Sequence, residues 1–262
     1  MDNLNGKVAL ITGASSGIGA VSAKLFACRG AKLSLIGRNE VNLKLVGDEC
    51  QRLGPTNAEE PLVIVADLCC EADVTQLVDT TIKKFGRLDI LVNNAGILEH
   101  GTIETTSLEQ YDRVMRTNVR SAYQLTMLCV PHLIATHGNI VNVSSIDGVR
   151  SFPGCLAYGL SKSAMDQMTK CTALELASNG VRVNSVNPGV IITDRPIQKR
   201  AGMSDDDYLE YIERRKKSHP LGRVGDADEV AEAIAFLASS DASFITGEQL
   251  HVDGGWHVTC AR

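Results

Sequence analysis

The chain has 262 residues, of which 44% are hydrophobic and 22% are charged, and its formal net charge is −5. This composition is sufficient to bury a globular core and argues against disorder, and the lack of a basic stripe argues against a nucleic-acid partner. No apolar run reaches the roughly 18–20 residues that span a membrane, and the N-terminus lacks the apolar segment of a signal peptide. We therefore expect a cytoplasmic protein that binds neither nucleic acid nor membrane.

Metal binding is not predicted either. The eight cysteines include no Cys-x-x-Cys pair, and the six histidines show no ligand spacing. The short basic cluster Arg214-Arg215-Lys216-Lys217 lies beside acidic residues. We interpret this cluster as the solvated face of a helix.

Short β-rich runs alternate with longer helical patterns along the chain. The predicted strands are Val8–Thr12, Lys32–Ile36, Leu62–Val65, Ile90–Asn93, Asn139–Val143, Arg182–Asn187 and Gln249–Val252. The predicted helices are Ile18–Arg29, Val41–Leu53, Val74–Phe85, Leu108–Ala135, Lys162–Ser178 and Glu229–Ala238. Helical crossovers between successive strands predict an α/β fold of the Rossmann type, a doubly wound seven-stranded parallel sheet with helices on both faces. We expect one domain over residues 1–262.

Residues 191–225 interrupt this alternation with a long, charged and partly helical segment. Within it, Ser204 and the three aspartates that follow resemble a helix N-cap with an acidic first turn. Because doubly wound proteins bind ligands beyond the carboxyl ends of their strands, we expect this excursion to contact substrate. A surface insertion without a ligand is the alternative.

A glycine-rich loop joins the first strand to the first helix. Glycines in such a strand–turn–helix let the backbone approach a pyrophosphate, whose charge is favoured at the helix N-terminus. A structural turn is the alternative. The loop supplies the predicted cofactor-binding residues Gly13, Ser15, Ser16, Gly17, Ile18 and Gly19.

The end of the second strand indicates which dinucleotide binds. An NAD site usually has Asp or Glu there for the ribose hydroxyls, whereas this strand ends with Gly37 and Arg38. Gly37 opens space, and the Arg38 guanidinium can pair with a 2′-phosphate, unless it only faces solvent. The pattern favours NADP(H) over NAD(H).

A tyrosine, a lysine and a serine have the spacing of a catalytic group. Tyr158 and Lys162 are four residues apart, which places them on one face of a helix, and Ser145 follows the predicted fifth strand. Ser144 competes for the serine role, but the spacing to Tyr158 favours Ser145. A Tyr-x-x-x-Lys pair alone carries little weight; together with the loop and the strand pattern it carries much more.

With these motifs, the whole chain resembles the classical short-chain dehydrogenase/reductase family, and Arg38 resembles its NADP(H)-preferring branch. The matching blocks are Thr12–Gly19, Asp67-Leu68, Asn93-Asn94-Ala95-Gly96, Asn118, Val143-Ser144-Ser145, Tyr158–Lys162, Asn187-Pro188-Gly189 and Val252-Asp253-Gly254-Gly255.

The resemblance implies that Tyr158 is the general acid of carbonyl reduction and the base of alcohol oxidation. Lys162 would hold the nicotinamide ribose and lower the pKa of the tyrosine, Ser145 would bind the substrate oxygen, and Asn118 would position a water in a proton relay. The cofactor site would also include Asp67 and Leu68 beside the adenine, Thr193 at the carboxamide, and Asn94, Ala95, Gly96, Pro188, Gly189 and Ile191.

The physical reasoning agrees with these roles. A free tyrosine has a pKa near ~10, so an efficient base at neutral pH needs a shift of about 4 kcal/mol, which a nearby ammonium and an oxidised nicotinamide can supply.

Three stretches should border a substrate pocket, namely 97–106, 146–156 and 191–225. They include Cys155 and an apolar set suited to a small or medium lipophilic carbonyl compound, either a 3-oxoacyl thioester or a steroid- or isoprenoid-type ketone. The apolar residues are Leu98, Val149, Phe152, Leu156, Ile191, Ile192, Ile197 and Met203. The stretches also contain three cations, Arg150, Lys199 and Arg200. These cations could bind a phosphate or carboxylate of the substrate, or they could simply face water.

The family usually forms homotetramers through its long helices and last strand, so the resemblance implies a homotetramer. Two other functions stay open: a non-catalytic NADP(H)-binding sensor or scaffold, and a dehydratase or epimerase of the extended branch. The presence of all four catalytic residues favours the oxidoreductase.

Overall fold

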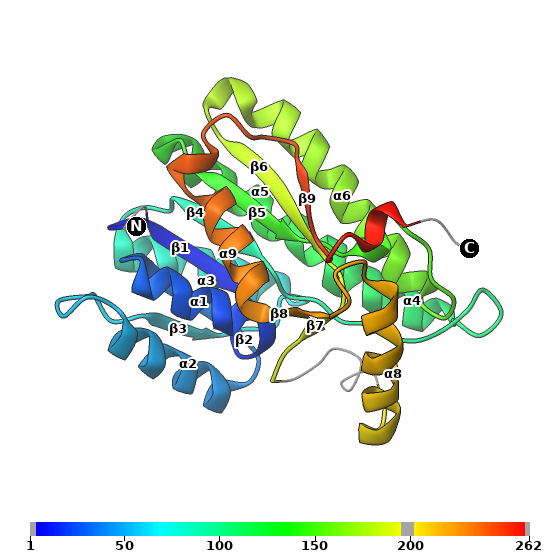
Figure 1. The fold of residues 1–262 in the computed structure, drawn as a ribbon. Coiled ribbons are helices and arrows are strands. Elements are labelled where there is room, and N and C mark those ends of the chain that lie inside the picture. The colour runs from blue at the N-terminus through cyan, green and yellow to red at the C-terminus, as the bar shows by residue number, and fades with distance from the viewer. Residues whose placement is uncertain (1–3, 195–201, 260–262) are drawn as a thin grey trace.

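Seven strands form one parallel sheet in the computed structural model, which describes residues 4–194 and 202–259. The strand order is β3-β2-β1-β4-β5-β6-β9 (Figure 1). The predicted doubly wound Rossmann fold is thereby confirmed. The strands are β1 (Val8–Thr12), β2 (Lys32–Gly37), β3 (Leu62–Val65), β4 (Ile90–Asn93), β5 (Asn139–Val143), β6 (Arg182–Pro188) and β9 (Gln249–Val252).

Helices cover both faces of the sheet because successive strand residues point to opposite sides. Ala9 and Ile11 of β1 pack toward α1, α2 and α9, whereas Val8 and Leu10 pack toward α3, α5 and α6. Figure 1 shows α1 and α9 together in front of the sheet. These helices are α1 (Gly17–Cys28), α2 (Glu40–Leu53), α3 (Glu71–Phe85), α5 (Ser121–Thr136), α6 (Leu156–Leu176) and α9 (Ala227–Ala238).

The helix predicted over 108–135 is not continuous. It is divided into α4 (Leu108–Met115), a π-helical turn (Arg116–Arg120) and α5. The turn contains Asn118, whose side chain bonds the backbone of Ile97. π-turns of this kind occur frequently at functional sites.

The helix predicted from Lys162 begins earlier, at Leu156. Pro153 and Gly154 end the preceding loop, and Gly154 adopts φ +78°, so the helix starts just after them. Tyr158 is consequently in the first turn of α6, one helical turn before Lys162.

The excursion after β6 contains two short strands and one helix. Strand β7 (Ile191–Ile192) pairs with β8 (Gly225–Asp226), and α8 (Asp205–Ser218) lies between them in the chain. Ser204 caps α8 as predicted, because its Oγ accepts a hydrogen bond from the Asp207 N–H at 3.2 Å. The predicted pocket residues Ile197, Lys199 and Arg200 lie outside the described residues.

A small hydrophobic core, separate from those on the two faces of the sheet, attaches α8 to the end of the sheet. Tyr208 and Ile212 of α8 are buried against Ile146, Val190 and Trp256. Figure 1 shows α8 beside the carboxyl ends of β6 and β9, on the side where the site described below lies. No helix among the described residues is long and apolar enough to cross a membrane.

Candidate active site

The glycine loop between β1 and α1 is pressed against the segment that follows β4. A Cβ on Gly13 would lie 2.8 Å from Asn94 Nδ2, and one on Gly19 would overlap the same amide and the Gly13 carbonyl. Gly13 and Gly17 also adopt left-handed φ values of +66° and +58°. The loop therefore requires glycine, and its bare backbone at the start of α1 fits a dinucleotide pyrophosphate.

Side-chain hydrogen bonds fix the two segments together. Thr12 Oγ1 accepts from the N–H groups of Asn94 and Ala95 at 2.9 and 3.0 Å, and Asn94 Nδ2 donates to the Thr12 carbonyl at 2.8 Å. The structure thus brings the predicted cofactor residues of both segments to one cavity of about 340 Å³. The predicted residues that line it include Gly13, Ser16, Gly17, Ile18, Asn94, Ala95, Gly96, Pro188, Gly189, Ile191 and Thr193.

Five predicted cofactor residues do not line this cavity: Ser15, Gly19, Arg38, Asp67 and Leu68. They are nevertheless close to it in the fold. A Cβ on Gly37 would lie 3.3 Å from Ser15, which allows the end of β2 to pack directly against the glycine loop. The Ala66 N–H donates to the Gly37 carbonyl at 3.1 Å, which brings the segment after β3 beside Arg38.

Arg38 is exposed, and its guanidinium forms no hydrogen bond or ion pair with any residue that the structure describes. Asp67 is also exposed, and its carboxylate accepts from the Cys69 N–H at 2.9 Å. The carboxyl ends of β2 and β3 therefore offer two charged groups to an adenosine moiety: the Arg38 guanidinium and the Asp67 carboxylate, which already accepts one hydrogen bond.

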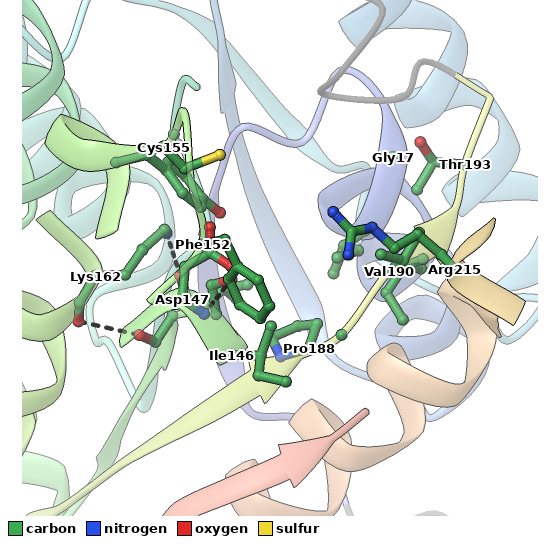
Figure 2. A pocket seen from close by; sticks show the side chains of 18 of the residues that line it. Gly17, Ile146, Asp147, Phe152, Cys155, Lys162, Pro188, Val190, Thr193 and Arg215 are labelled. Carbon is green, nitrogen blue, oxygen red and sulfur yellow. Dashed lines mark hydrogen bonds between the residues drawn. The ribbon is translucent and has the colours of Figure 1, made fainter. Parts of the chain in front are cut away.

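Ser145, Tyr158 and Lys162 all line the cavity, and Figure 2 shows Lys162 on the side opposite Arg215. Ser145 is the second residue after β5, and its Oγ accepts a hydrogen bond from the Asp147 N–H at 3.1 Å. Its hydroxyl also interacts with the phenol of Tyr158. Lys162 Nζ donates to the Val143 carbonyl at 2.8 Å and lies 5.6 Å from the centre of the Tyr158 ring. All three side chains are at least nine-tenths buried.

Burial controls the protonation of this group. Burial and then the Asp147 carboxylate raise the pKa of Tyr158, whereas the hydrogen bond with Ser145 opposes them. Burial lowers the pKa of Lys162 to about 8, although Asp166 and Asp147 raise it. In the protein alone, the tyrosine is thus a firmly protonated acid beside a lysine that is still charged at neutral pH.

Asn118 supports the same wall from the π-helical turn. Its Oδ1 accepts from the Ile97 N–H at 2.8 Å, and its Nδ2 donates to the Ile97 carbonyl and to Ser161 Oγ, both at 2.9 Å. A Cβ on Gly96 would lie 3.4 Å from Asn118 Oδ1 and 3.7 Å from Lys162 Nζ. Oδ1 keeps one acceptor position, so the relay role of Asn118 stays a prediction.

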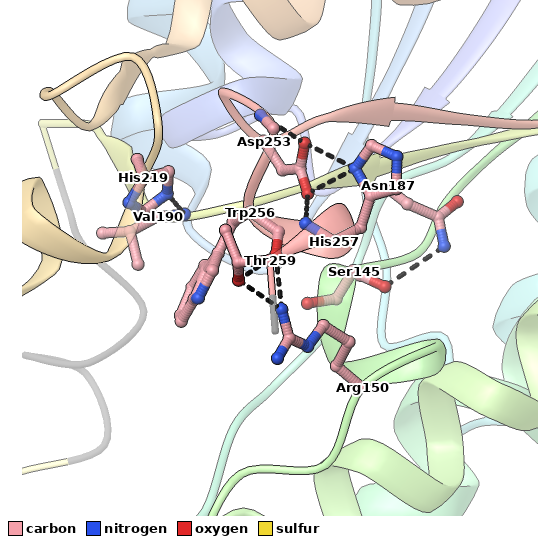
Figure 3. A network of polar contacts seen from close by, with 10 residues as sticks. Ser145, Arg150, Asn187, Val190, His219, Asp253, Trp256, His257 and Thr259 are labelled. Carbon is pink, nitrogen blue, oxygen red and sulfur yellow. Dashed lines mark hydrogen bonds and ion pairs between the residues drawn. The ribbon is translucent and has the colours of Figure 1, made fainter. Parts of the chain in front are cut away.

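Sequence reasoning missed a buried polar network behind Ser145. Asn187 Nδ2 donates to the Ser145 carbonyl at 3.1 Å and to the Asp166 carboxylate at 3.0 Å (Figure 3 shows the first bond). Ser144 interacts with Asp166 and lowers the pKa of that carboxyl, and its Oγ donates to the Lys162 carbonyl at 3.2 Å. Ser144 is therefore engaged with α6, which favours Ser145 as the serine at Tyr158.

The far wall of the cavity is less polar. Of the predicted apolar set, Phe152, Ile191 and Met203 line it, whereas Leu98, Val149, Leu156 and Ile192 do not. Asp147, Tyr211 and Arg215 also line the cavity; they belong to the predicted stretches but were not singled out as site residues. Trp256 lies outside those stretches and was missed. Arg150 does not face the cavity as a free cation, because it donates to Thr259 Oγ1 at 2.7 Å and to the Trp256 carbonyl (Figure 3).

Cys155 lies in the cavity wall as expected. Burial, together with the Asp147 charge, raises the pKa of its thiol to about 11. Because the thiolate is the reactive form, this cysteine is a poor nucleophile at neutral pH.

The excursion also contacts the cofactor side of the cavity. The Asp194 carboxylate accepts a hydrogen bond from the Gly17 N–H at 2.7 Å. This N–H is at the N-terminus of α1, where a pyrophosphate oxygen is favoured. A carboxylate from the substrate side thus competes for a cofactor-binding donor.

The fold and this site together define a nicotinamide-dependent oxidoreductase that acts on carbonyl and alcohol substrates. Comparisons with known proteins agree. Residues 13–257 match the family described as enoyl-(acyl carrier protein) reductase. The chain belongs to the short-chain dehydrogenase/reductase family.

Several relatives match the chain over nearly its whole length. A 3-oxoacyl-(acyl-carrier-protein) reductase of Thermotoga maritima is 38% identical over 96% of this chain and 98% of its own. A 4-formylbenzenesulfonate dehydrogenase of Comamonas testosteroni is 40% identical over 98% and 100%. The solved 3-ketoacyl-(acyl-carrier-protein) reductase from Brucella melitensis, complexed with NADH, is 37% identical, with a TM-score of 0.86 over 97% of this chain and 100% of that one.

Proposed function

We propose that this protein is an NADP(H)-dependent reductase of ketones or aldehydes, and a dehydrogenase of the corresponding alcohols, with Tyr158 as its general acid and base. The observation that carries the proposal is the convergence of Ser145, Tyr158 and Lys162, all buried, in the cavity that the glycine loop opens into. When bound, the nicotinamide cofactor supplies or accepts the hydride.

The residues of the chain account for the proton chemistry. A carbonyl oxygen placed at Ser145 and Tyr158 would accept hydrogen bonds from both hydroxyls, which stabilises the developing alkoxide. The raised pKa of Tyr158 keeps its proton available for transfer to that oxygen. The charge of Lys162 opposes the raised pKa when the reaction runs toward alcohol oxidation, where the phenolate form is required.

NADP(H) rather than NAD(H) is proposed from the end of β2. Arg38 forms no ion pair among the described residues, and it stands directly after Gly37, where an NAD site usually has an acid for the ribose hydroxyls. The Brucella relative is complexed with NADH, so the cofactor of this chain needs its own measurement.

The test of this preference is the affinity for NADPH and NADH in Arg38→Ala. We expect NADPH to bind about ten- to hundred-fold more weakly and NADH to change by less than about threefold. Arg52→Ala, which removes an exposed charge from α2, is the matched control. An equal loss for both cofactors, or no loss, would refute the role of Arg38.

The substrate proposal follows from the far wall of the cavity. Phe152, Pro153, Ile191, Met203 and Trp256 give this wall an apolar surface. It suits a small or medium lipophilic carbonyl compound, such as a 3-oxoacyl thioester or a steroid- or isoprenoid-type ketone. The reductase from Thermotoga and the dehydrogenase from Comamonas are both named for carbonyl compounds.

A homotetramer is proposed from the exposed apolar surface of the long helices and from the edge of the sheet. Tyr123 and Met127 on α5 and Leu174 on α6 are more than half exposed, and β9 is an edge strand. The mass of the protein in solution at micromolar concentration tests this assembly. A monomer would refute it.

A further inference from the structure

The guanidinium of Arg215 lies in an aromatic box at the far wall of the cavity. Its Cζ is 5.8 Å from the ring centre of Phe152, 5.0 Å from that of Tyr211 and 5.1 Å from that of Trp256. Arg215 lines the cavity, and Figure 2 shows its guanidinium pointing into it from α8. The sequence interpretation of this arginine as part of a solvated helix face is therefore wrong.

Its hydrogen-bond donors remain available. The guanidinium of Arg215 forms no hydrogen bond or ion pair within the part of the chain that the structure describes. Two nearby arginines differ in this respect: Arg150 bonds Thr259 and the Trp256 carbonyl, and Arg223 forks onto Glu229. Aromatic faces orient a guanidinium but do not engage its N–H groups, so the fork of Arg215 stays free for an oxyanion.

The position of Arg215 is fixed by its backbone. His219 Nδ1 donates to the Arg215 carbonyl at 2.6 Å, and His219 Nε2 accepts from the Val190 N–H at 3.3 Å (Figure 3 shows the second bond). Tyr208 and Ile212, about two turns and one turn earlier in α8, are buried. The side chain therefore starts from a helix turn that is attached to the end of β6.

One negative group faces the same space. Asp147 lines the cavity, and the charge of Arg215 lowers the pKa of Asp147 against the burial that raises it to about 6. The two side chains nevertheless form no ion pair. Asp147 belongs to the same loop as Ser145, whereas Arg215 comes from α8 across the cavity (Figure 2). Arg215 is thus a cation on the far wall, opposite the wall that holds Asp147 and Lys162.

We propose that Arg215 binds an oxyanion of the substrate, a carboxylate, sulfonate or phosphate, at the end remote from the carbonyl that reacts at Tyr158. This inference rests on the proposed function, because it names the class of substrate for the same site. The substrate would have an apolar body against Phe152 and Trp256 and one anionic end. An arginine fork in an apolar surrounding discriminates strongly against a neutral group in the same position.

The first test measures binding without turnover. Trp256 is the only tryptophan of the chain and contacts the Arg215 guanidinium, so its fluorescence reports this site. The protein saturated with oxidised cofactor is titrated with hexanoate, hexanesulfonate and hexyl phosphate at constant ionic strength, and with the neutral hexanamide. We expect the anions to bind more tightly than the amide, and the tightest anion identifies the oxyanion class.

Arg215→Gln, which keeps a polar stem on the rings, should weaken anion binding by about ten- to hundred-fold and leave hexanamide within about threefold. Arg214→Gln is the matched control, because Arg214 is exposed and paired with Glu210 at 3.8 Å. Arg215→Lys keeps the positive charge but not the two-pronged guanidinium, so its affinity for the anions should lie between that of the native protein and that of Arg215→Gln. Equal binding of hexanoate and hexanamide, or an equal loss in the Arg214 variant, would overturn the inference.

The second test uses turnover with a matched pair of aldehydes, 4-carboxybenzaldehyde and its methyl ester. Arg215→Gln should lower kcat/KM for the acid by about ten- to hundred-fold and for the ester by less than about threefold. Reduction of both aldehydes with no dependence on Arg215 would overturn the inference and leave the proposed function standing. Anion binding at Trp256 with reduction of neither aldehyde would support the inference and count against the proposed function.

Discussion

The two walls of the cavity differ in how the chain builds them. The cofactor wall consists of backbone: a glycine loop and strand ends that approach each other so closely that a Cβ on Gly13 or Gly19 would collide with Asn94. The substrate wall consists of side chains that are far apart in sequence, such as Phe152, Arg215 and Trp256. A wall made of backbone tolerates little change, whereas a wall made of side chains can change its ligand by substitution.

Apart from loss of Tyr158 itself, the largest effect is expected at Ser145, where the cofactor wall and the substrate wall meet. Ser145→Ala removes the hydroxyl that interacts with Tyr158 and should lower kcat by about 10²–10³-fold. Ser144→Ala is the matched control, because Ser144 donates to the Lys162 carbonyl, and it should cost less than about tenfold. Steady-state kinetics of carbonyl reduction compares them. Equal losses in both variants would show that the serine adjacent to Tyr158 has no special role.

Gly19→Ala should break the cofactor wall selectively. The new methyl group would overlap Asn94 Nδ2 and the Gly13 carbonyl, so we expect cofactor to bind about ten- to hundred-fold more weakly. Gly159→Ala is the control, since its Cβ would meet only the Asp147 carbonyl at 3.4 Å. Calorimetric titration with NADPH measures both. Unchanged affinity in Gly19→Ala would contradict the close backbone packing described above.

Asp194 tests whether the two walls are coupled. Its carboxylate accepts from the Gly17 N–H, where it competes with the pyrophosphate, so Asp194→Ala should tighten cofactor binding by about two- to fivefold. Asp228→Asn removes an exposed charge from the first turn of α9 and should leave affinity unchanged. Weaker cofactor binding in Asp194→Ala would instead make this carboxylate a support of the loop.

The smallest effect concerns the pH dependence of alcohol oxidation. The Asp147 carboxylate raises the pKa of Tyr158, and oxidation requires the phenolate, so its rate rises as pH passes the tyrosine pKa. Asp147→Asn lowers that pKa and should move the acid limb of kcat/KM to lower pH by about one unit or less. Asp206→Asn on exposed α8 should not move it. A shift to higher pH would have the wrong sign for this account.

The sequence was sufficient to predict the sheet and the cofactor wall because both depend on local patterns. Alternating strands and helices predict the doubly wound sheet, and Gly13, Gly17 and Gly19 satisfy a backbone requirement that is visible in the sequence itself. The π-helical turn was not predictable, because it depends on Asn118 bonding the distant backbone of Ile97.

The substrate wall was poorly predicted for a related reason. Arg215 has charged neighbours on both sides, which favoured a solvated face. Arg215 is seven residues after Tyr208 and three after Ile212, which places it on their buried helix face, and this signal was present in the sequence. That Trp256 and Phe152 meet there depends on the path of the chain after β9, which periodicity does not specify.

The central claim is hydride transfer under the control of Tyr158, and its most direct test is cofactor oxidation across a carbonyl panel. The panel contains acetoacetyl thioesters, steroid and isoprenoid ketones and carboxylated aldehydes, each with NADPH and NADH, for the native protein and for Tyr158→Phe. The account predicts turnover of one class, faster with NADPH, and a loss of about 10²–10⁴-fold in Tyr158→Phe with cofactor binding retained. Tight cofactor binding without turnover of any carbonyl, or equal turnover in Tyr158→Phe, would contradict it.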